Sequence, residues 1–295
     1  MIDGIFFVNL HMEKGQITPK NTCIIIGNGF DINLGLPTSY TDFVKSTHFD
    51  DMVKRGNELA KYLKSKFELQ NWIDIENELK IYSLERSDAS FKSNYELLIC
   101  ALINYLNELD YSMIKPDSAA YRLIESISES CDNFNILDYN YTKSIEIILR
   151  NKFVDESTIK NSLIKVHGEA AKNDIIFGVE DNASIKPEHV FLRKAYPRYY
   201  KALNFNSIFA NAKRIIIFGH SLGETDYTYF HELFRDSCQD GSSYRQRIVN
   251  KAFDFIYYKE EGYHKLMQRI DALTMNKLTA FRQFNYVQFL DVEQL

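Results

Sequence analysis

Residues 22–37, which read TCIIIGNGFDINLGLP, constrain the fold more than any other stretch of this 295-residue chain. The apolar run at 23–26 is rich in β-branched residues, which is typical of a strand buried on both faces of a parallel sheet. Gly27 and Gly29 then break the strand, since glycine adopts positive φ or lets a ligand lie against bare backbone. A helical turn is expected next. Free N–H groups and the helix dipole favour an anion there, so the stretch predicts a phosphate cradle.

The glycine spacing departs from the dinucleotide-binding fingerprint of dehydrogenases. That fingerprint has a third glycine three residues after the second, and an acidic residue about 20 residues further on. Here the third glycine is Gly35, followed by Pro37, and the next predicted strand begins only at residue 134. An ordinary dehydrogenase is therefore not predicted.

Composition indicates a globular protein with a large core, because 45% of the residues are hydrophobic and 25% are charged. The net charge is −5 and no basic block occurs, which argues against nucleic acid as the main partner. The four cysteines form no C-x-x-C pair, so no metal site is predicted and free thiols in a reducing cytoplasm are expected. They are Cys23, Cys100, Cys131 and Cys238.

Residues 5–10 are apolar, but this segment is too short to span a membrane and lacks the features of a signal peptide. We interpret it as an extra β-segment, or as an upstream extension if translation starts at Met12. A cytoplasmic protein without a membrane partner is expected.

Helical periodicity dominates residues 44–110, where apolar side chains recur at i, i+3 and i+4. We interpret this stretch as a helical insertion that caps the ligand site of a core formed by residues 1–43 and 111–295. In the core, predicted strands alternate with helices, which favours a Rossmann-like, doubly wound and mostly parallel α/β sheet. Further strands are expected at 134–138, 163–166, 175–178, 214–218, 253–258 and 284–290. Helices are expected at 118–131, 143–151, 187–204 and 263–275.

Polar motifs follow four of the predicted strands. They are Gly27-Asn28-Gly29, Asp138-Tyr139-Asn140-Tyr141-Thr142, His167-Gly168 and Gly219-His220-Ser221-Leu222. In a doubly wound sheet, ligands bind outside the carboxyl ends of the strands. We therefore expect the four motifs to converge on one ligand.

Three segments resemble the AbiH family of bacterial phage abortive-infection proteins. They are G-N-G-F-D-x-x-x-G-L-P-T-S-Y from Gly27, W-x-D-I-E from Trp72 to Glu76, and G-H-S-L-G-x-x-D from Gly219 to Asp226. The resemblance implies a role in phage defence, with Glu76 pointing into the pocket and Asp226 capping or lining it. From the residues alone, Trp72 anchors a helix interface and the acidic face around Glu76 is solvated.

The order of the strand-end motifs resembles the sirtuin superfamily, in which a glycine loop precedes T-Q-N, H-G and G-T-S-L. The resemblance covers about residues 23–223 without the insertion. It implies a sirtuin-like, NAD-binding fold with Asn140 and His167 as the catalytic pair. Asp31 replaces the usual sirtuin serine with a carboxylate that can stabilise developing positive charge. The residues implied to bind NAD are Gly27, Asn28, Gly29, Phe30, Gly35, Pro37, Gly219, His220, Ser221, Leu222 and Asp226.

These side chains suit cleavage of the nicotinamide–ribose bond, which passes through an oxocarbenium-like state. The leaving nicotinamide starts as a cation, so no strong general acid is needed. Asn140 can orient the ribose or a water molecule, and His167 can act as base because histidine titrates near neutral pH. The structural alternatives are that Asn140 and Asp31 cap helices and that His167 is a hydrogen-bonded histidine before a turn.

Departures from the sirtuin pattern change the expected acceptor. No zinc cysteines follow His167, and the aspartate that follows T-Q-N-I in sirtuins is Thr142 here. Water is therefore expected as acceptor in place of a protein substrate, which makes the chain an NAD glycohydrolase. NAD or a related nucleotide is the predicted ligand, while a homo-oligomer and a phage-derived trigger are partners that the sequence leaves open.

Two other functions stay open. A non-catalytic nucleotide sensor would signal through the helical insertion. Residues 219–223 also fit G-x-S-x-G, the nucleophile elbow of α/β-hydrolases, with Ser221 as nucleophile. The histidines after Ser221 are His231, only ten residues on, and His264, which precedes the final predicted strand. The order of a hydrolase triad is therefore poorly matched.

Overall fold

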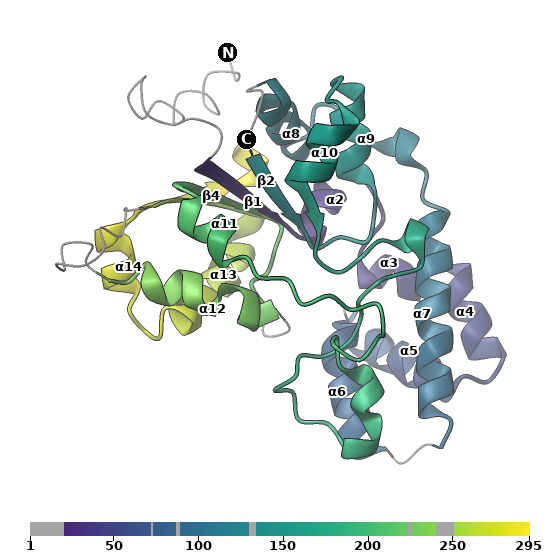
Figure 1. Cartoon of the computed structure of the whole chain (residues 1–295). Coiled ribbons are helices and arrows are strands. Elements are labelled where there is room, and N and C mark those ends of the chain that lie inside the picture. Colours follow the sequence, from purple (N-terminus) through teal and green to yellow (C-terminus); the bar gives the residue numbers. More distant parts are fainter. Residues whose placement is uncertain (1–20, 72, 87–88, 130–133, 224–225, 240–250) are drawn as a thin grey trace.

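A six-stranded sheet forms the centre of the protein (Figure 1), and the computed structural model describes residues 21–71, 73–86, 89–129, 134–223, 226–239 and 251–295. The strands are β1 (Thr22–Ile26), β2 (Phe134–Asp138), β3 (Leu163–Lys165), β4 (Arg214–Phe218), β5 (Ala252–Tyr257) and β6 (Tyr286–Asp291). Their order is β3-β2-β1-β4-β5-β6, and every neighbouring pair is parallel. This is the strand order of the doubly wound fold, so the prediction of an α/β protein with a parallel sheet is confirmed. The predictions for residues 5–10 and for Trp72 lie outside the described residues.

Helices cover both faces of the sheet, because successive side chains of a strand point to opposite faces. In β1, Ile24 and Ile26 face one layer, and Cys23 and Ile25 face the other. The first layer contains α2 (Asn28–Asn33), α8 (Ala119–Glu129), α9 (Ser144–Asn151) and α10 (Glu156–Ser162). The second contains α11 (Asn206–Asn211), α12 (Tyr227–Asp236), α13 (Lys259–Leu273) and α14 (Leu278–Phe284). These four side chains are fully buried, which explains the continuous apolar run at 23–26.

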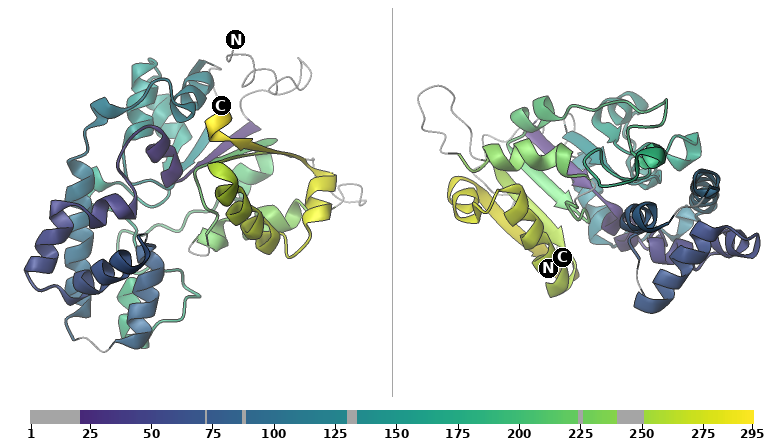
Figure 2. Two further views of the ribbon diagram at one scale, coloured as in Figure 1. Left: turned by 180° about the vertical axis from the view of Figure 1, so that it is seen from behind. Right: turned by 90° about the horizontal axis from the view of Figure 1, so that it is seen from below.

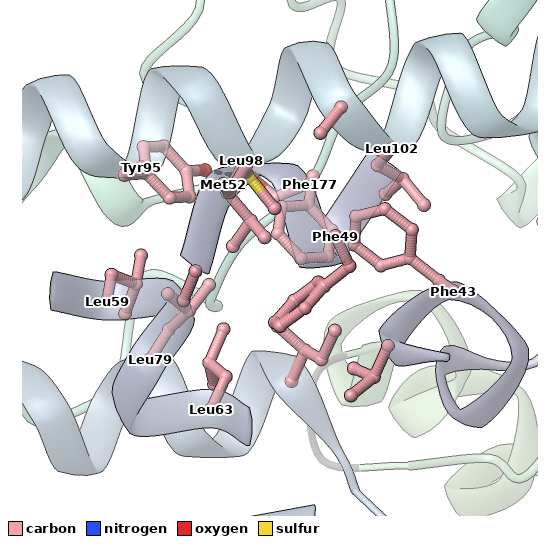
Figure 3. Packing of buried hydrophobic residues seen from close by; sticks show 14 of the residues in the cluster. Phe43, Phe49, Met52, Leu59, Leu63, Leu79, Tyr95, Leu98, Leu102 and Phe177 are labelled. Carbon is pink, nitrogen blue, oxygen red and sulfur yellow. Dashed lines mark hydrogen bonds between the residues drawn. The ribbon is translucent and has the colours of Figure 1, made fainter. Parts of the chain in front are cut away.

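The helical insertion has a hydrophobic core of its own. It contains α4 (Thr47–Lys54), α5 (Glu58–Gln70), α6 (Ile75–Glu85) and α7 (Phe91–Asn107), and the short α3 (Tyr40–Val44) packs with them. Figure 2 shows these helices at the far end of the molecule from α13 and α14. Phe177 joins this core from far along the chain (Figure 3): its ring stacks on Tyr95, whose hydroxyl donates to the Phe177 carbonyl at 2.6 Å. The boundaries of the insertion at residues 44 and 110 stay a prediction.

Two predicted elements were wrong, and both belong to the segment that packs on the insertion. Residues 175–178 form no strand, because Gly178 has a φ of +139° and Phe177 is buried in the core of the insertion rather than in the sheet. The helix predicted at 187–204 is helical only in the 3₁₀ helix η4 (Pro187–Leu192). Apolar side chains of both segments, such as Phe177 and Phe191, pack against Tyr95 of α7. Local periodicity in the sequence cannot reveal this contact. The other described 3₁₀ helices are η2 (Tyr111–Met113), η3 (Ala170–Lys172) and η6 (Val292–Gln294).

Candidate functional site

The loops after β1 and β4 touch backbone to backbone at the carboxyl end of the sheet. The N–H of Gly27 donates to the carbonyl of Phe218 (3.1 Å), and the N–H of Gly29 donates to that of Gly219 (3.0 Å). Gly219 has a φ of +64°, and a Cβ atom there would lie 2.3 Å from the backbone nitrogen of Phe30. Glycine at this position is therefore required for the two loops to meet. The amide of Gly29 is already bonded within the protein.

A pocket of about 290 Å³ opens beside this loop contact. The chain leaves β1 and β4 toward opposite faces of the sheet, so the pocket lies at the switch point where doubly wound proteins bind ligands. The lining residues that the sequence analysis singled out are Gly27, Asn28, Asp31, Glu76, Asn140, His167, Gly219, His220, Ser221 and Asp226. The other lining residues are Thr38, Tyr40, Asp74, Leu102, Leu106, Tyr139, Tyr141 and Thr142, of which Tyr139, Tyr141 and Thr142 lie in the strand-end motif after β2.

Several residues implied to bind NAD do not line this pocket; they are Gly29, Phe30, Gly35, Pro37 and Leu222. The ring of Phe30 packs edge-on against Phe218, with 5.4 Å between centroids. Leu222 is buried in the second hydrophobic layer of the sheet. The carbonyl of Pro37 accepts a hydrogen bond from the hydroxyl of Tyr105 at 2.6 Å. These contacts give the loops their shape.

Asn140 and His167 come from different strands, and both line the pocket. The backbone N–H of Asn140 donates to Asp138 (2.9 Å), and its side-chain nitrogen donates to the carbonyl of Gly27 (3.2 Å). Among the described residues, nothing donates to its side-chain oxygen, which can therefore accept a hydrogen bond from a ligand. Asn140 does not cap the following helix, since the N-cap residue of α9 is Lys143.

Asp31 is fully buried at the edge of the pocket. One carboxylate oxygen accepts a hydrogen bond from the hydroxyl of Ser144 (2.6 Å), and the other accepts one from Thr142 (2.7 Å). Burial raises the pKa of Asp31, and the two hydroxyls offset part of this effect. Because both oxygens are bonded, Asp31 anchors the loop after β2 to α2.

A buried group of charges, which we call the Lys165 cluster, is made by Lys165 of β3, Asp138 of β2 and Glu146 of α9. Lys165 Nζ lies 2.7 Å from Asp138 Oδ2 and 3.3 Å from Glu146 Oε2, and it donates to the carbonyl of Thr142. Burial raises the pKa of Asp138 to about 7, against the opposing effect of Lys165. Burial lowers the pKa of Lys165, but the two carboxylates outweigh it and raise this pKa overall. None of the three residues lines the pocket.

A second buried group, which we call the Lys194 cluster, joins the sheet to the helical insertion. Lys194 Nζ lies 2.9 Å from Asp226 Oδ1 and 3.6 Å from Glu76 Oε2 in α6. The Nε2 atoms of His167 and His220 lie 3.1 and 3.4 Å from the two carboxylate oxygens of Asp226. Asp226 is the N-cap residue of α12, but its side chain caps no helix amide. Lys194, His167 and His220 therefore surround the carboxylate of Asp226, and Glu76 joins the cluster through Lys194.

The Lys194 cluster contains an ionised carboxylate and a neutral histidine. Burial raises the pKa of Asp226, but Lys194 and His167 outweigh it and hold this pKa well below its usual range. Burial, and then Lys194, lower the pKa of His167, so its imidazole is neutral near pH 7. His167 Nε2 lies within ion-pair distance of Asp226 but is not aligned for a hydrogen bond. His220 Nδ1 accepts from the N–H of Leu222 (3.0 Å), so the proton of the neutral ring lies on Nε2, toward Asp226.

Tyr139 packs against both histidines, with ring centroids 4.3 Å from His220 and 5.1 Å from His167. It therefore restricts the orientation of the two imidazoles. Tyr139 lies inside a motif at the end of a predicted strand, so the sequence contained a signal for it. Lys194 lies in a segment with no motif, and no sequence signal pointed to it.

Ser221 is exposed at the pocket but forms no hydrogen bond with a histidine of the described chain. The neighbouring His220 directs its two ring nitrogens to Leu222 and Asp226. The nucleophile and base of a serine hydrolase are therefore not assembled here.

The described residues contain neither a cluster of potential metal ligands nor a long apolar helix. Within these ranges, no group of three His, Cys, Asp or Glu residues is arranged to hold a metal ion. No helix in the same part of the chain is both long and apolar enough to cross a bilayer. Cys23, Cys100 and Cys238 are free thiols.

The fold and the pocket define an α/β protein with a doubly wound parallel sheet and a pocket at its switch point. The chain matches the family described as Bacteriophage abortive infection AbiH over residues 23–249. It therefore belongs to the AbiH family, and the resemblance seen in its motifs is confirmed. This membership suggests phage abortive-infection defence. No curated protein matches the chain.

Proposed function

We propose that the pocket binds NAD or a closely related nucleotide and that the protein hydrolyses the nicotinamide–ribose bond. The observation that carries this proposal is that Asn140 and His167, far apart in the chain, line one pocket at the switch point of the sheet. A sirtuin-like relationship, based on the order of the strand-end motifs, supports the same ligand. An infected cell that loses its NAD would stop supporting phage, which would account for abortive infection.

The chemistry requires few protein groups. A water oxygen attacks the ribose carbon while the bond to nicotinamide breaks, and nicotinamide leaves with the bonding electrons as a neutral molecule. His167 takes the proton from the water, since its imidazole is neutral near pH 7. The side-chain oxygen of Asn140 accepts a hydrogen bond from the ribose or from the water. Asp226 stabilises the imidazolium that forms.

The charges of the pocket favour the nicotinamide end of the dinucleotide. The carboxylate side chains among its lining residues are Asp31, Asp74, Glu76 and Asp226, whereas no lining residue is a lysine or arginine. Such a wall attracts the cationic nicotinamide ring more than the phosphates, although Lys194 behind it offsets part of the charge of Asp226 and Glu76. The volume of about 290 Å³ is at the small end of the roughly 300–1,000 Å³ typical of ligand sites. We therefore assign the pocket to nicotinamide and its ribose, with the phosphates toward solvent.

Release of nicotinamide from NAD by the purified protein tests the proposal. Asn140→Ala and His167→Ala should each reduce the rate by about 10²–10⁴, the usual contribution of positioned acid–base groups. Lys61→Met removes a lysine from an exposed ion pair in α5 and serves as the control variant. Circular dichroism checks that each variant is folded. Wild-type protein that binds NAD without releasing nicotinamide would contradict the hydrolase.

A nucleotide sensor is the second candidate, and the Lys194 cluster favours it. Glu76 of the helical insertion and Asp226 beside the sheet contact the same lysine, so a ligand in the pocket can change how the insertion is held. Tight NAD binding without turnover, together with altered hydrogen exchange in α6, would support the sensor.

A further inference from the structure

Lys194 lies where three parts of the chain meet. Its N–H donates to the carbonyl of Val179 (2.9 Å), and the N–H of Val179 donates to the carbonyl of Leu192 (2.8 Å), so the intervening loop is closed at its base. Lys194 is only 4% exposed. Its ammonium group reaches Asp226 beside the sheet and Glu76 in the insertion. The loop, the sheet and the insertion are thus joined at one cation.

We propose that Lys194 is a positioning residue of the pocket, which holds the carboxylate of Asp226 in place against His167. Through its contact with Glu76 it also ties this carboxylate to the helical insertion. The catalytic part of this inference rests on the proposed function, whereas the effect of Lys194 on the charge of His167 does not.

Stability alone is a weak reason for this lysine. Burying two opposite charges costs desolvation free energy that cancels much of their attraction. Apolar residues therefore often stabilise a buried site equally well. Lys194 does more than fill space, because its charge disfavours a second positive charge on His167. It also keeps Asp226 ionised beside that ring. The result is a neutral imidazole next to a fixed carboxylate, which is the arrangement that a general base requires.

Other groups around His167 must be considered in any titration. The charged, titratable or aromatic side chains that face its ring are Tyr139 and Tyr141 after β2, Lys194 of the closed loop, His220 after β4, and Asp226 and Tyr229 at the start of α12. The positive charge of Lys194 can be removed without changing an aromatic contact of the ring.

Titration of the histidine ring resonances by NMR tests the inference without any substrate. The signal of His167 is assigned by its loss in His167→Gln. In Lys194→Met its titration midpoint should move to higher pH, because a nearby positive charge is gone. Lys194→Arg should keep the wild-type midpoint. Lys64→Met, which removes a half-buried lysine paired with Asp50 in the insertion, is the matched control and should change nothing. An unchanged midpoint in Lys194→Met would overturn the inference.

The pH profile of NAD cleavage provides the second measurement. The base must be neutral, so a higher pKa moves the acid limb of the profile to higher pH. Lys194→Met should do this and lower the rate at neutral pH by about 10²-fold, as misplaced catalytic groups do, while Lys194→Arg recovers most of it. If the wild type cleaves no NAD, the proposed function fails, and the ring titration still decides the role of Lys194.

Lys194→Met leaves two buried carboxylates, so it can fail to fold. In that case Lys194→Met/Glu76→Gln, which also removes one carboxylate charge, is compared with Glu76→Gln alone. A higher His167 midpoint in the double variant supports the inference, and equal midpoints contradict it.

Discussion

The Lys165 and Lys194 clusters both place a lysine between two carboxylates, but they join different parts of the molecule. Lys165 links β3 to the end of β2 and to α9, all within one half of the sheet. Lys194 links the helical insertion to the start of α12, and both of its carboxylates line the pocket. The first cluster holds neighbouring strand ends together, whereas the second surrounds two histidines. Only the second has side chains that line the pocket.

The aspartates of the two clusters show how strongly surroundings control charge. Asp138 is fully buried, with other carboxylates nearby, and burial raises its pKa to about 7. Asp226 is also buried, yet a lysine and two imidazoles hold its pKa well below the usual range. The pKa of the same side chain is therefore raised in one cluster and lowered in the other.

The largest expected effect on stability is the loss of Lys165. Lys165→Met leaves Asp138 and Glu146 without their cation inside the protein, so it should lower the free energy of unfolding by about 3–5 kcal/mol. Lys194→Met should lower it by only about 1–3 kcal/mol, because its carboxylates face a pocket that water can enter. Urea unfolding at pH 7 measures both. If Lys194→Met were the more destabilising variant, the contrast between the clusters would be wrong.

Lys61→Met calibrates this series. Lys61 and its partner Glu58 are exposed, so the change should alter the free energy of unfolding by less than about 1 kcal/mol.

The two aspartates should give opposite pH dependence. Asp138 has a pKa of 3.8 when unfolded and about 7 when folded, so between these values the folded state binds more protons. Its contribution to stability therefore falls as pH rises from about 4 to 7, by roughly 2–4 kcal/mol. Asp226 has a lower pKa when folded, so its contribution is present above pH 3.8 and is lost as pH falls below it.

Asp138→Asn should accordingly flatten the fall in unfolding free energy between pH 4 and 7, and Asp226→Asn should flatten only the loss below pH 4. Urea unfolding across this pH range measures the slopes. The same change of slope in both variants would show that the two carboxylates do not differ in the way described.

A smaller effect is expected from Thr142→Val. The threonine hydroxyl donates to Asp31 at 2.7 Å, and Ser144 continues to donate after the change. The free energy of unfolding should fall by about 1–2 kcal/mol. Thr158→Val, which removes an exposed hydroxyl bonded to Asp155, is the control and should cost less. Equal losses in the two variants would mean that burial adds nothing to the bond with Asp31.

Local patterns in the sequence predicted the elements whose physical cause is local. The apolar run after Asn21 forms β1, since a strand that is covered on both faces has no solvent-exposed face for polar side chains. Its glycine turn and short helix follow as expected. Residues 175–178, wrongly predicted as a strand, are equally apolar, but the ring of Phe177 packs on Tyr95 of α7, which lies 82 residues earlier in the chain. Apolar character predicts that a side chain is buried, but it does not identify the part of the protein against which the side chain packs.

The candidate site was predictable where motifs follow strands. The carboxyl ends of parallel strands lie at one edge of the sheet, so the sequence predicts that Asn140, His167 and Asp226 lie near one another, and all three line the pocket. The glycines have a different role from the expected one, because the N–H groups of Gly27 and Gly29 donate to the carbonyls of Phe218 and Gly219 and are not left free for a phosphate. In the sequence, a glycine that is required for backbone contact between two loops cannot be distinguished from a glycine that is required for ligand binding.

The sequence by itself determined the alternation of strands and helices, the glycine turn and the polar strand ends, because these depend on side chains close together in the chain. Only the tertiary structure decided that Lys194 reaches Asp226 and Glu76 and that Asp31 is bonded on both oxygens. The strength of a charge depends on how far it is from water and from other charges. Those distances exist only once the chain is folded.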